Sequence, residues 1–236
     1  MAILGMIFVC AAWFFGLIFV ARLAFPVPDP AAGSQQIAQF YLEHQAQILI
    51  ACFFILCGTA LLGPWGAVIA AMTRRVESGL PIWTYTQVAC TAFAVFDLSM
   101  AAMFWALAAY RAGEQHADIT QMLNDVAWFF ALIPFQPYTV WLIAIAVPVL
   151  RATPDDANPT LPRWSAYLSL LAGFVFVLDG LMMFFKSGPL AYNGFLAFYV
   201  PYFVFGLWIV LMTVAIVQGL RLYSRGEDLE AATADV

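Results

Sequence analysis

Two charged side chains lie close together near the end of one long apolar stretch of this sequence. Asp179 and Lys186 are seven residues apart. On a continuous α-helix this spacing is nearly two turns, so both side chains would share a face, about 10 Å apart in height. A charge inside a membrane span costs roughly 2.5–3.5 kcal/mol and therefore usually faces protein or water. The pattern predicts a polar cavity in the outer half of a helix bundle. The alternative is that Lys186 extends to the lipid headgroups while Asp179 makes a structural hydrogen bond.

A second acid, Asp97, occupies a similar position in an earlier apolar stretch. Asp97 lies 16 residues after Pro81, and Asp179 lies 17 residues after Pro162; each proline is followed by a tryptophan two positions later. The similarity suggests a duplicated hairpin that presents one acid from each copy, as in transporter repeats. Convergence is the alternative, because proline suits a first helical turn and tryptophan suits the membrane interface.

Further polar and aromatic side chains near the outer ends of the apolar stretches are candidates for the same site: Glu43, His44, Asn124, Asp125, Trp128, Gln136 and Asn193. Each also has an ordinary structural interpretation. Asp125 would favour a helix N-terminus, and Trp128 would pack or join the interfacial belt. Gln136 would bond to carbonyls that neighbouring prolines free, and Glu43-His44 would be a hydrated interfacial pair instead of a proton shuttle.

The composition identifies the elements that must position these residues. The 236-residue chain is 64% hydrophobic and only 10% charged, whereas about a quarter of the residues in soluble domains are charged. Long apolar runs predict an all-α, polytopic membrane protein, since a barrel would show short alternating segments instead. We expect six transmembrane helices, at about 3–25, 45–72, 82–110, 122–150, 164–185 and 195–223. The duplicated hairpins would be spans two and three, and spans four and five.

Several boundaries follow from local signals. Ser34 is a candidate cap for a short interfacial helix before span two, and Pro134 and Pro137 predict a kink in span four. Residues 1–223 would form a single transmembrane domain. The acidic tail, 224–236, is expected to be disordered and cytoplasmic.

The distribution of basic residues predicts the orientation. With six spans, both termini lie on one side, together with Arg74, Arg75, Arg151, Arg163, Arg221 and Arg225; the other side holds Arg22, Arg111 and Lys186. The positive-inside rule therefore predicts cytoplasmic termini.

Familiar catalytic motifs are missing from the sequence. It has no nucleophile elbow, phosphate-binding glycine loop, HExxH motif or haem-ligand pair, and no basic patch suited to nucleic acid. The four cysteines fall inside apolar spans and the two histidines are far apart, so we expect neither a disulfide framework, a metal site nor a cofactor. Catalysis, if any, would depend on carboxylates, a lysine and water.

Residues 184–198, and less clearly 124–129, resemble a family of bacterial six-span membrane proteins to which no activity is assigned. The resemblance covers the C-terminal half of the chain, from about residue 120. It implies a location in the bacterial inner membrane and transfers no activity.

Three functions remain open from the sequence. The first is binding or transport of a hydrophobic small molecule, such as a lipid, isoprenoid or sterol-like compound, in an outward-facing, polar-lined cavity. The second is a membrane isomerase or cyclase in which Asp97 or Asp179 acts as general acid. The third is a structural subunit of a larger complex. Membrane lipids are expected contacts in each case, with a homo-oligomer or partner subunits as further expectations.

Overall fold

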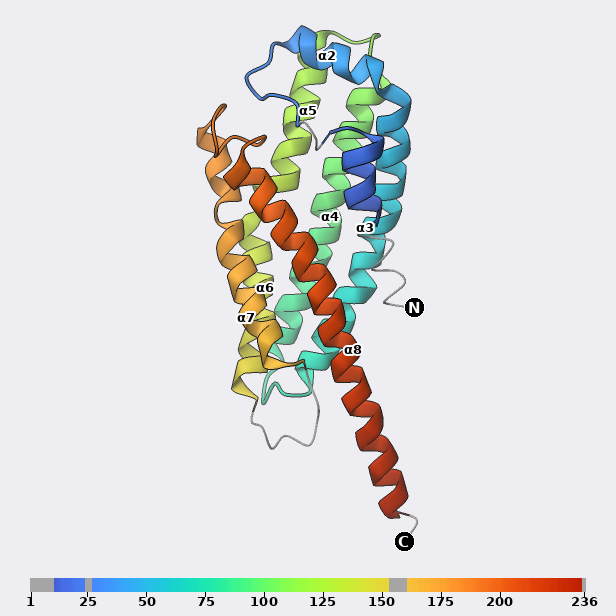
Figure 1. Ribbon diagram of the computed structural model, residues 1–236, viewed down its shortest axis with the longest axis vertical. Helices are drawn as coiled ribbons and strands as arrows, with labels where there is room; N and C mark the ends of the chain where they lie inside the picture. The colour runs from blue at the N-terminus through green and yellow to red at the C-terminus, as the bar shows by residue number, and fades with distance from the viewer. Residues whose placement is uncertain (1–10, 24–26, 153–160, 235–236) are drawn as a thin grey trace.

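The computed structural model describes residues 11–23, 27–152 and 161–234, and every regular element within them is helical (Figure 1). The elements are the π-helix η1 (Ala11–Val20), α2 (Ser34–Glu43), α3 (Gln45–Arg74), α4 (Ile82–Tyr110), α5 (Ala117–Leu132), α6 (Phe135–Arg151), α7 (Arg163–Phe176), the 3-10 helix η2 (Asp179–Phe184), the π-helix η3 (Phe195–Tyr199) and α8 (Val200–Ala234). The all-α prediction is confirmed.

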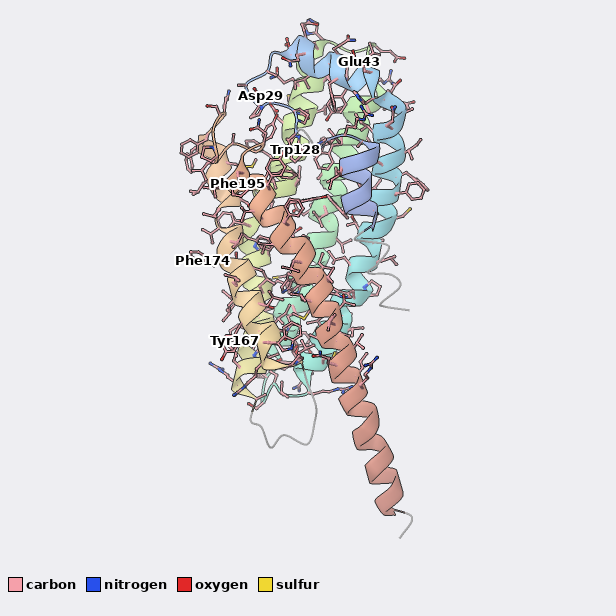
Figure 2. The ribbon with its side chains drawn as sticks, in the orientation of Figure 1. Asp29, Glu43, Trp128, Tyr167, Phe174 and Phe195 are labelled. Atoms are coloured by element: carbon pink, nitrogen blue, oxygen red, sulfur yellow. The ribbon has the colours of Figure 1, made fainter. Side chains whose placement is uncertain are left out.

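Five segments of the described chain are long and apolar enough to cross a bilayer: Gln45–Arg74, Ile82–Tyr110, Ala117–Arg151, Arg163–Phe184 and Phe195–Arg221. Large apolar side chains project outward from them, as Tyr167, Phe174 and Phe195 do in Figure 2. In a soluble protein such a surface would promote aggregation, whereas lipid tails accommodate it. The fold is therefore compatible with a multi-pass membrane protein whose outer surface contacts lipid.

The predicted first span, 3–25, lies partly outside the described residues. Its described part is η1, a ten-residue π-helix that packs against α3 near the α2 end of the bundle (Figure 1). Ten residues are too few to cross a bilayer alone, so the described segments do not establish the count of six.

The predicted kink in span four is a complete break. α5 ends at Leu132, and Pro134 is the N-cap of α6. Proline lacks an amide hydrogen and its ring clashes with the preceding turn, which favours a helix boundary there. α5 and α6 together are still long and apolar enough to cross a membrane as one segment, Ala117–Arg151.

The start of span two also divides into two helices. α2 lies across one end of the bundle, and the chain turns at His44 into α3 (Figure 1). Predicting Ser34 as the cap was wrong, because Gly33 is the N-cap and no side chain bonds there. Ser34 is instead the first helical residue.

The predicted shared face of Asp179 and Lys186 is wrong. α7 ends at Phe176, η2 follows from Asp179, and Phe185 is extended. The two residues therefore do not lie on one continuous α-helix. Gly180 packs so closely on the ring of Phe135 that a Cβ atom would overlap it, a contact between distant segments that residue spacing does not reveal.

In the acidic C-terminal segment, for which the sequence predicts disorder, α8 continues to Ala234 and projects beyond the bundle (Figure 1). Alanine, leucine and glutamate favour helix, and extending an existing helix avoids the cost of nucleation.

Close packing of small residues holds the central helices together. Gly66 of α3 lies against Thr91 of α4, where a Cβ atom would overlap the threonine side chain. In membranes, such small residues let helix backbones approach closely. α4 lies at the centre of this arrangement and packs against α3, α5 and α6.

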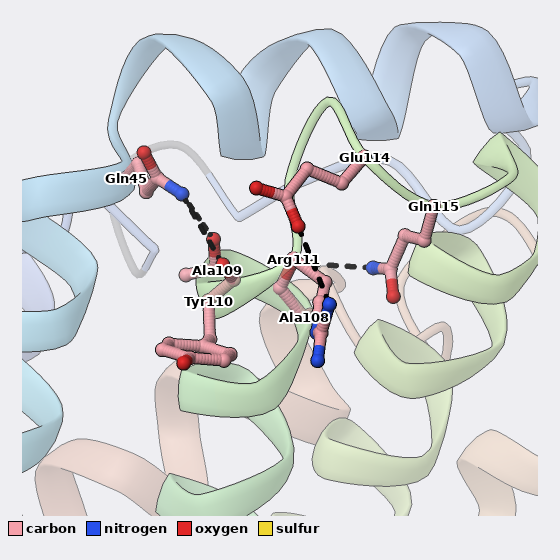
Figure 3. A network of polar contacts seen from close by, with 7 residues as sticks. All are labelled: Gln45, Ala108, Ala109, Tyr110, Arg111, Glu114 and Gln115. Carbon is pink, nitrogen blue, oxygen red and sulfur yellow. Dashed lines mark hydrogen bonds and ion pairs between the residues drawn. The ribbon is translucent and has the colours of Figure 1, made fainter.

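Glutamine side chains complete the C-terminal end of α4 (Figure 3). Gln45 Nε2 donates to the Ala109 carbonyl at 2.9 Å, and Gln115 Nε2 donates to the Ala108 carbonyl at 3.4 Å. The last carbonyls of a helix lack intrahelical partners, and these bonds satisfy two of them. The same glutamines fix the α2–α3 turn and the α4–α5 loop to one end of the bundle.

Candidate ligand cavity among the helices

A cavity of about 90 Å³ lies between the two clusters of buried side chains that form the core. Its walls come from η1, α3, α4, α5, α6, α7, η2, η3 and α8, and are mostly aromatic or aliphatic: Trp13, Leu17, Thr59, Leu62, Leu98, Trp105, Trp128, Ala131, Leu132, Phe135, Tyr138, Phe176, Asp179, Phe198, Pro201, Tyr202, Phe205 and Ile209. Small-molecule sites usually combine such apolar walls with a few polar groups.

Among the described residues of this lining, Asp179 is the one acid. Its residue is 7% exposed, and its Oδ1 atom has no hydrogen-bond partner among the described residues. Burying an unpaired polar atom costs about 1–3 kcal/mol. Asp179 is therefore an acid in the cavity wall whose burial is not compensated at this oxygen by the described residues.

Asp97 and Asp179 approach the same tyrosine. Tyr138, at the start of α6, donates a hydrogen bond of 3.3 Å from its hydroxyl to Asp97 Oδ2. Asp97 is fully buried, and its Oδ1 atom has no partner within the described structure. Tyr138 also interacts electrostatically with Asp179. Tyr138 is therefore bonded to one of the two acids singled out in the sequence and lines the cavity together with the other.

Two tryptophans form the wall nearer the α2 end, where Trp128 lies among the helices (Figure 2). Trp105 of α4 and Trp128 of α5 pack edge to face, with ring centroids 5.1 Å apart. Both are fully buried, and neither indole Nε1 atom has a hydrogen-bond partner among the described residues. In contrast, Trp13 Nε1 donates to Thr59 Oγ1 at 2.9 Å.

Tyr192 closes the site at the α2 end. Its ring stacks on Trp128 with centroids 5.4 Å apart, and its hydroxyl donates to Asp125 Oδ1 at 3.5 Å. Asn124 Nδ2 donates to the Tyr192 hydroxyl at 3.3 Å, and Tyr41 donates to Asn124 Oδ1 at 3.0 Å. Burial raises the pKa of Tyr192 and that of Tyr41 above the usual value for a phenol. This network joins α2, α5 and the loop before η3.

Lys186 does not join Asp179. It is exposed, and its electrostatic interaction is with Asp125. Of the residues considered in the sequence, Asp179 and Trp128 line the cavity, Asp97 lies behind Tyr138, and Asn124 and Asp125 belong to the Tyr192 network.

Four other candidate residues lie away from the cavity lining. Gln136 and Glu43 are exposed, and Glu43 accepts a bond of 2.8 Å from Gln39. The His44 ring stacks on Phe40 and its Nδ1 atom lies 3.0 Å from the Phe40 carbonyl oxygen. Asn193 is half-buried in the loop before η3. These positions match the ordinary interfacial interpretation of Glu43 and His44.

Sequence reasoning missed two tyrosines that bond to acids, Tyr138 to Asp97 and Tyr192 to Asp125. Tyr138 directly follows Pro137, and Tyr192 precedes Asn193. Their partners, Asp97 and Asn124, are 41 and 68 residues away, so only the fold brings them together. For Tyr138, the signal available in the sequence was its position directly after a proline in an apolar stretch.

No family model, characterised protein or solved structure matches this chain. Within the described residues, no group of three or more His, Cys, Asp or Glu side chains is arranged to hold a metal ion.

Proposed function

We propose that this protein binds or transports a hydrophobic small molecule, such as a lipid, isoprenoid or sterol-like compound, within the cavity. The observation that carries the proposal is the unpartnered carboxyl oxygen of Asp179 in a largely aromatic wall. An apolar ligand would fill the space between the two core clusters. A polar group on that ligand would satisfy the buried carboxyl.

The proposed topology has six spans, with η1 part of the first, and cytoplasmic termini in a bacterial inner membrane. Exposed arginines support this orientation: Arg74, Arg75, Arg151 and Arg163 lie at the ends of α3, α6 and α7, opposite α2 (Figure 1). Arg111 and Lys186 lie at the α2 end, which would face outward. The resemblance of residues 184–198 to a bacterial family supports the choice of membrane.

We also propose that the hairpins α3–α4 and α5–α6–α7 derive from a duplication. Pro81 and Pro162 are both N-caps, of α4 and α7, and Asp97 and Asp179 both approach Tyr138. The copies would have diverged where α7 ends at Phe176, since α4 continues through Asp97.

Native mass spectrometry of protein extracted gently from its own membrane tests the proposed function. We expect wild type to retain a small apolar ligand, and Asp179→Leu to be folded but without it. Asp118→Leu is the matched control, because Asp118 is exposed and pairs only with His116 among the described residues. A wild-type chain that carries no ligand, alone or with partner subunits attached, would contradict the proposal and favour a structural role.

The link between Asp97, Tyr138 and Asp179 supports a second candidate, an isomerase or cyclase. In that case Asp179 would protonate an apolar substrate, and the Asp97–Tyr138 pair would position it. The test compares the ligand retained by wild type with the ligand retained by Asp179→Asn. An enzyme would hold product in the first and substrate in the second, whereas a binding protein would hold the same molecule in both.

A further inference from the structure

We infer that the ligand is an uncharged, elongated molecule with an oxygen-bearing group at each end: a hydrogen-bond acceptor at the tryptophan pair and a hydroxyl donor at Asp179. This inference rests on the proposed function and specifies the chemistry of the ligand. It follows from two kinds of buried polar atom without hydrogen-bond partners, indole nitrogens and a carboxyl oxygen, and from their separation along the bundle.

The tryptophan end offers donors only. The Nε1 atoms of Trp105 and Trp128 are buried and without partners in the described structure, and an indole can donate but not accept. An acceptor such as a hydroxyl or carbonyl oxygen would satisfy them. An ammonium group has no acceptor and would leave both donors unpaired.

The Asp179 end offers an acceptor. Its Oδ1 atom has no partner among the described residues, so a hydroxyl hydrogen from the ligand would satisfy it. A ligand carboxylate would meet like charge here, and none of the described lining residues is lysine or arginine. Both considerations disfavour an anionic ligand, and the unpaired indole donors disfavour a cation at the other end.

The two ends are separated along the bundle. Tyr138 contacts Asp97 on α4 and interacts with Asp179, so Asp97 marks the height of the carboxyl end. Trp105 is eight residues further along the same helix, a rise of about 12 Å. A single hydroxyl cannot serve both ends, whereas a slender molecule about 12 Å long or slightly longer can.

The cavity volume also favours a slender ligand. About 90 Å³ is small beside the roughly 300–1,000 Å³ typical of drug-sized sites. Among simple compounds, 1,10-decanediol has the required length, shape and terminal hydroxyls. 1-Decanol lacks one of the two oxygens, and 1,10-diaminodecane replaces both with cations.

The experiment is calorimetric titration of the purified full chain, with native ligand removed, using these three compounds. We expect the diol to bind about fivefold more tightly than decanol, as one additional hydrogen bond predicts, and the diamine to bind most weakly. Trp105→Phe, Trp128→Phe and Asp179→Leu should each reduce this preference at least twofold relative to wild type. Expressing every affinity as a wild-type to variant ratio cancels differences in detergent partitioning.

Trp141→Phe is the control for the indole substitutions. Trp141 Nε1 is also buried without a partner in the described structure, but Trp141 does not line the cavity. Its substitution should leave the diol preference unchanged. Phenylalanine keeps an aromatic ring in place, and the ranking of compounds by wild type does not depend on whether a variant folds.

Decanol binding as tightly as the diol, or the diamine binding most tightly, would overturn the inference. If wild type retains a native ligand but binds none of the three compounds, the inference fails and the proposed function stands. If wild type neither retains a ligand nor binds any compound, both fail.

Discussion

Asp179 and Glu77 are two buried acids that differ in how their carboxyl groups are hydrogen-bonded. The Asp179 Oδ1 atom lacks a hydrogen-bond partner among the described residues. Glu77 is also buried, but both of its carboxylate oxygens accept hydrogen bonds. The Glu77 carboxylate accepts bonds from the backbone amides of Trp83 and Thr84 at 2.7 and 3.1 Å, at the start of α4. The two acids should therefore respond in opposite ways to the same substitution.

We predict that Asp179→Leu raises the thermal stability of the ligand-free protein by about 1–3 kcal/mol, because it removes an unsatisfied buried group. Glu77→Leu should lower stability by a similar amount, because it leaves the first amides of α4 without their acceptor. Thermal unfolding in detergent measures both. A loss of stability in Asp179→Leu would mean that this carboxyl has a structural partner.

Tyr192 predicts a pH dependence at the α2 end. Burial raises the pKa of the Tyr192 phenol above its ordinary value of about 10, so the folded protein holds this proton more firmly than the unfolded chain. The contribution is complete below about pH 10 and is lost as the pH rises above it. Tyr192→Phe should therefore weaken the decline of stability in the alkaline range, as measured by unfolding between about pH 8 and 12.

Tyr167→Phe is the control for this titration, since Tyr167 is exposed on α7. This substitution leaves the contacts of Tyr192 with Asn124 and Asp125 in place, so the variant should unfold as wild type does. A Tyr192→Phe profile identical to wild type would contradict the assigned role of the phenol.

Residue types in the sequence were enough to select Asp97, Asp179 and Trp128, because acids are rare in apolar spans. They could not select Tyr138 or Tyr192, whose importance comes from contacts across the fold. The pairing of Asp179 with Lys186 failed because it assumed a continuous helix through residues 179–186.

At the scale of helices, some helix ends are determined by the residues at that end, whereas others depend on contacts with distant residues. Pro134 ends a helix through its own geometry, so the break between α5 and α6 could be predicted from sequence. The end of α7 at Phe176 coincides with contacts such as Gly180 against Phe135, which depend on α6. Helix ends of the second kind need the structure.

The glycines of α3 provide a matched test of helix packing. We predict that Gly66→Ala destabilises the protein by about 1–3 kcal/mol, because the new methyl group would overlap Thr91 of α4. At Gly63 an added Cβ would meet no atom within 4 Å, so Gly63→Ala should be neutral or stabilise by about 0.5–1 kcal/mol through helix propensity. Thermal unfolding of both variants distinguishes packing from propensity, and equal effects would contradict the close α3–α4 contact.

At the scale of the whole molecule, the basic residues are distributed unequally between the two ends of the bundle. We predict that a membrane-impermeant maleimide labels Glu114→Cys in intact cells, and labels Ser78→Cys only after permeabilisation. Both positions are exposed, at opposite ends of α4. The unsubstituted protein is the control for the native cysteines, and the reverse pattern would place the α2 end in the cytoplasm.

The most direct test of the central claim is an experimental density map of wild-type protein purified gently from its own membrane. We predict an elongated, non-protein density between the Trp105–Trp128 pair and Asp179, bounded by the side chains that line the cavity. Its absence from Asp179→Leu under the same conditions would assign it to a bound ligand. A cavity closed by its own side chains in wild type, with Asp179 bonded to protein, would contradict the account.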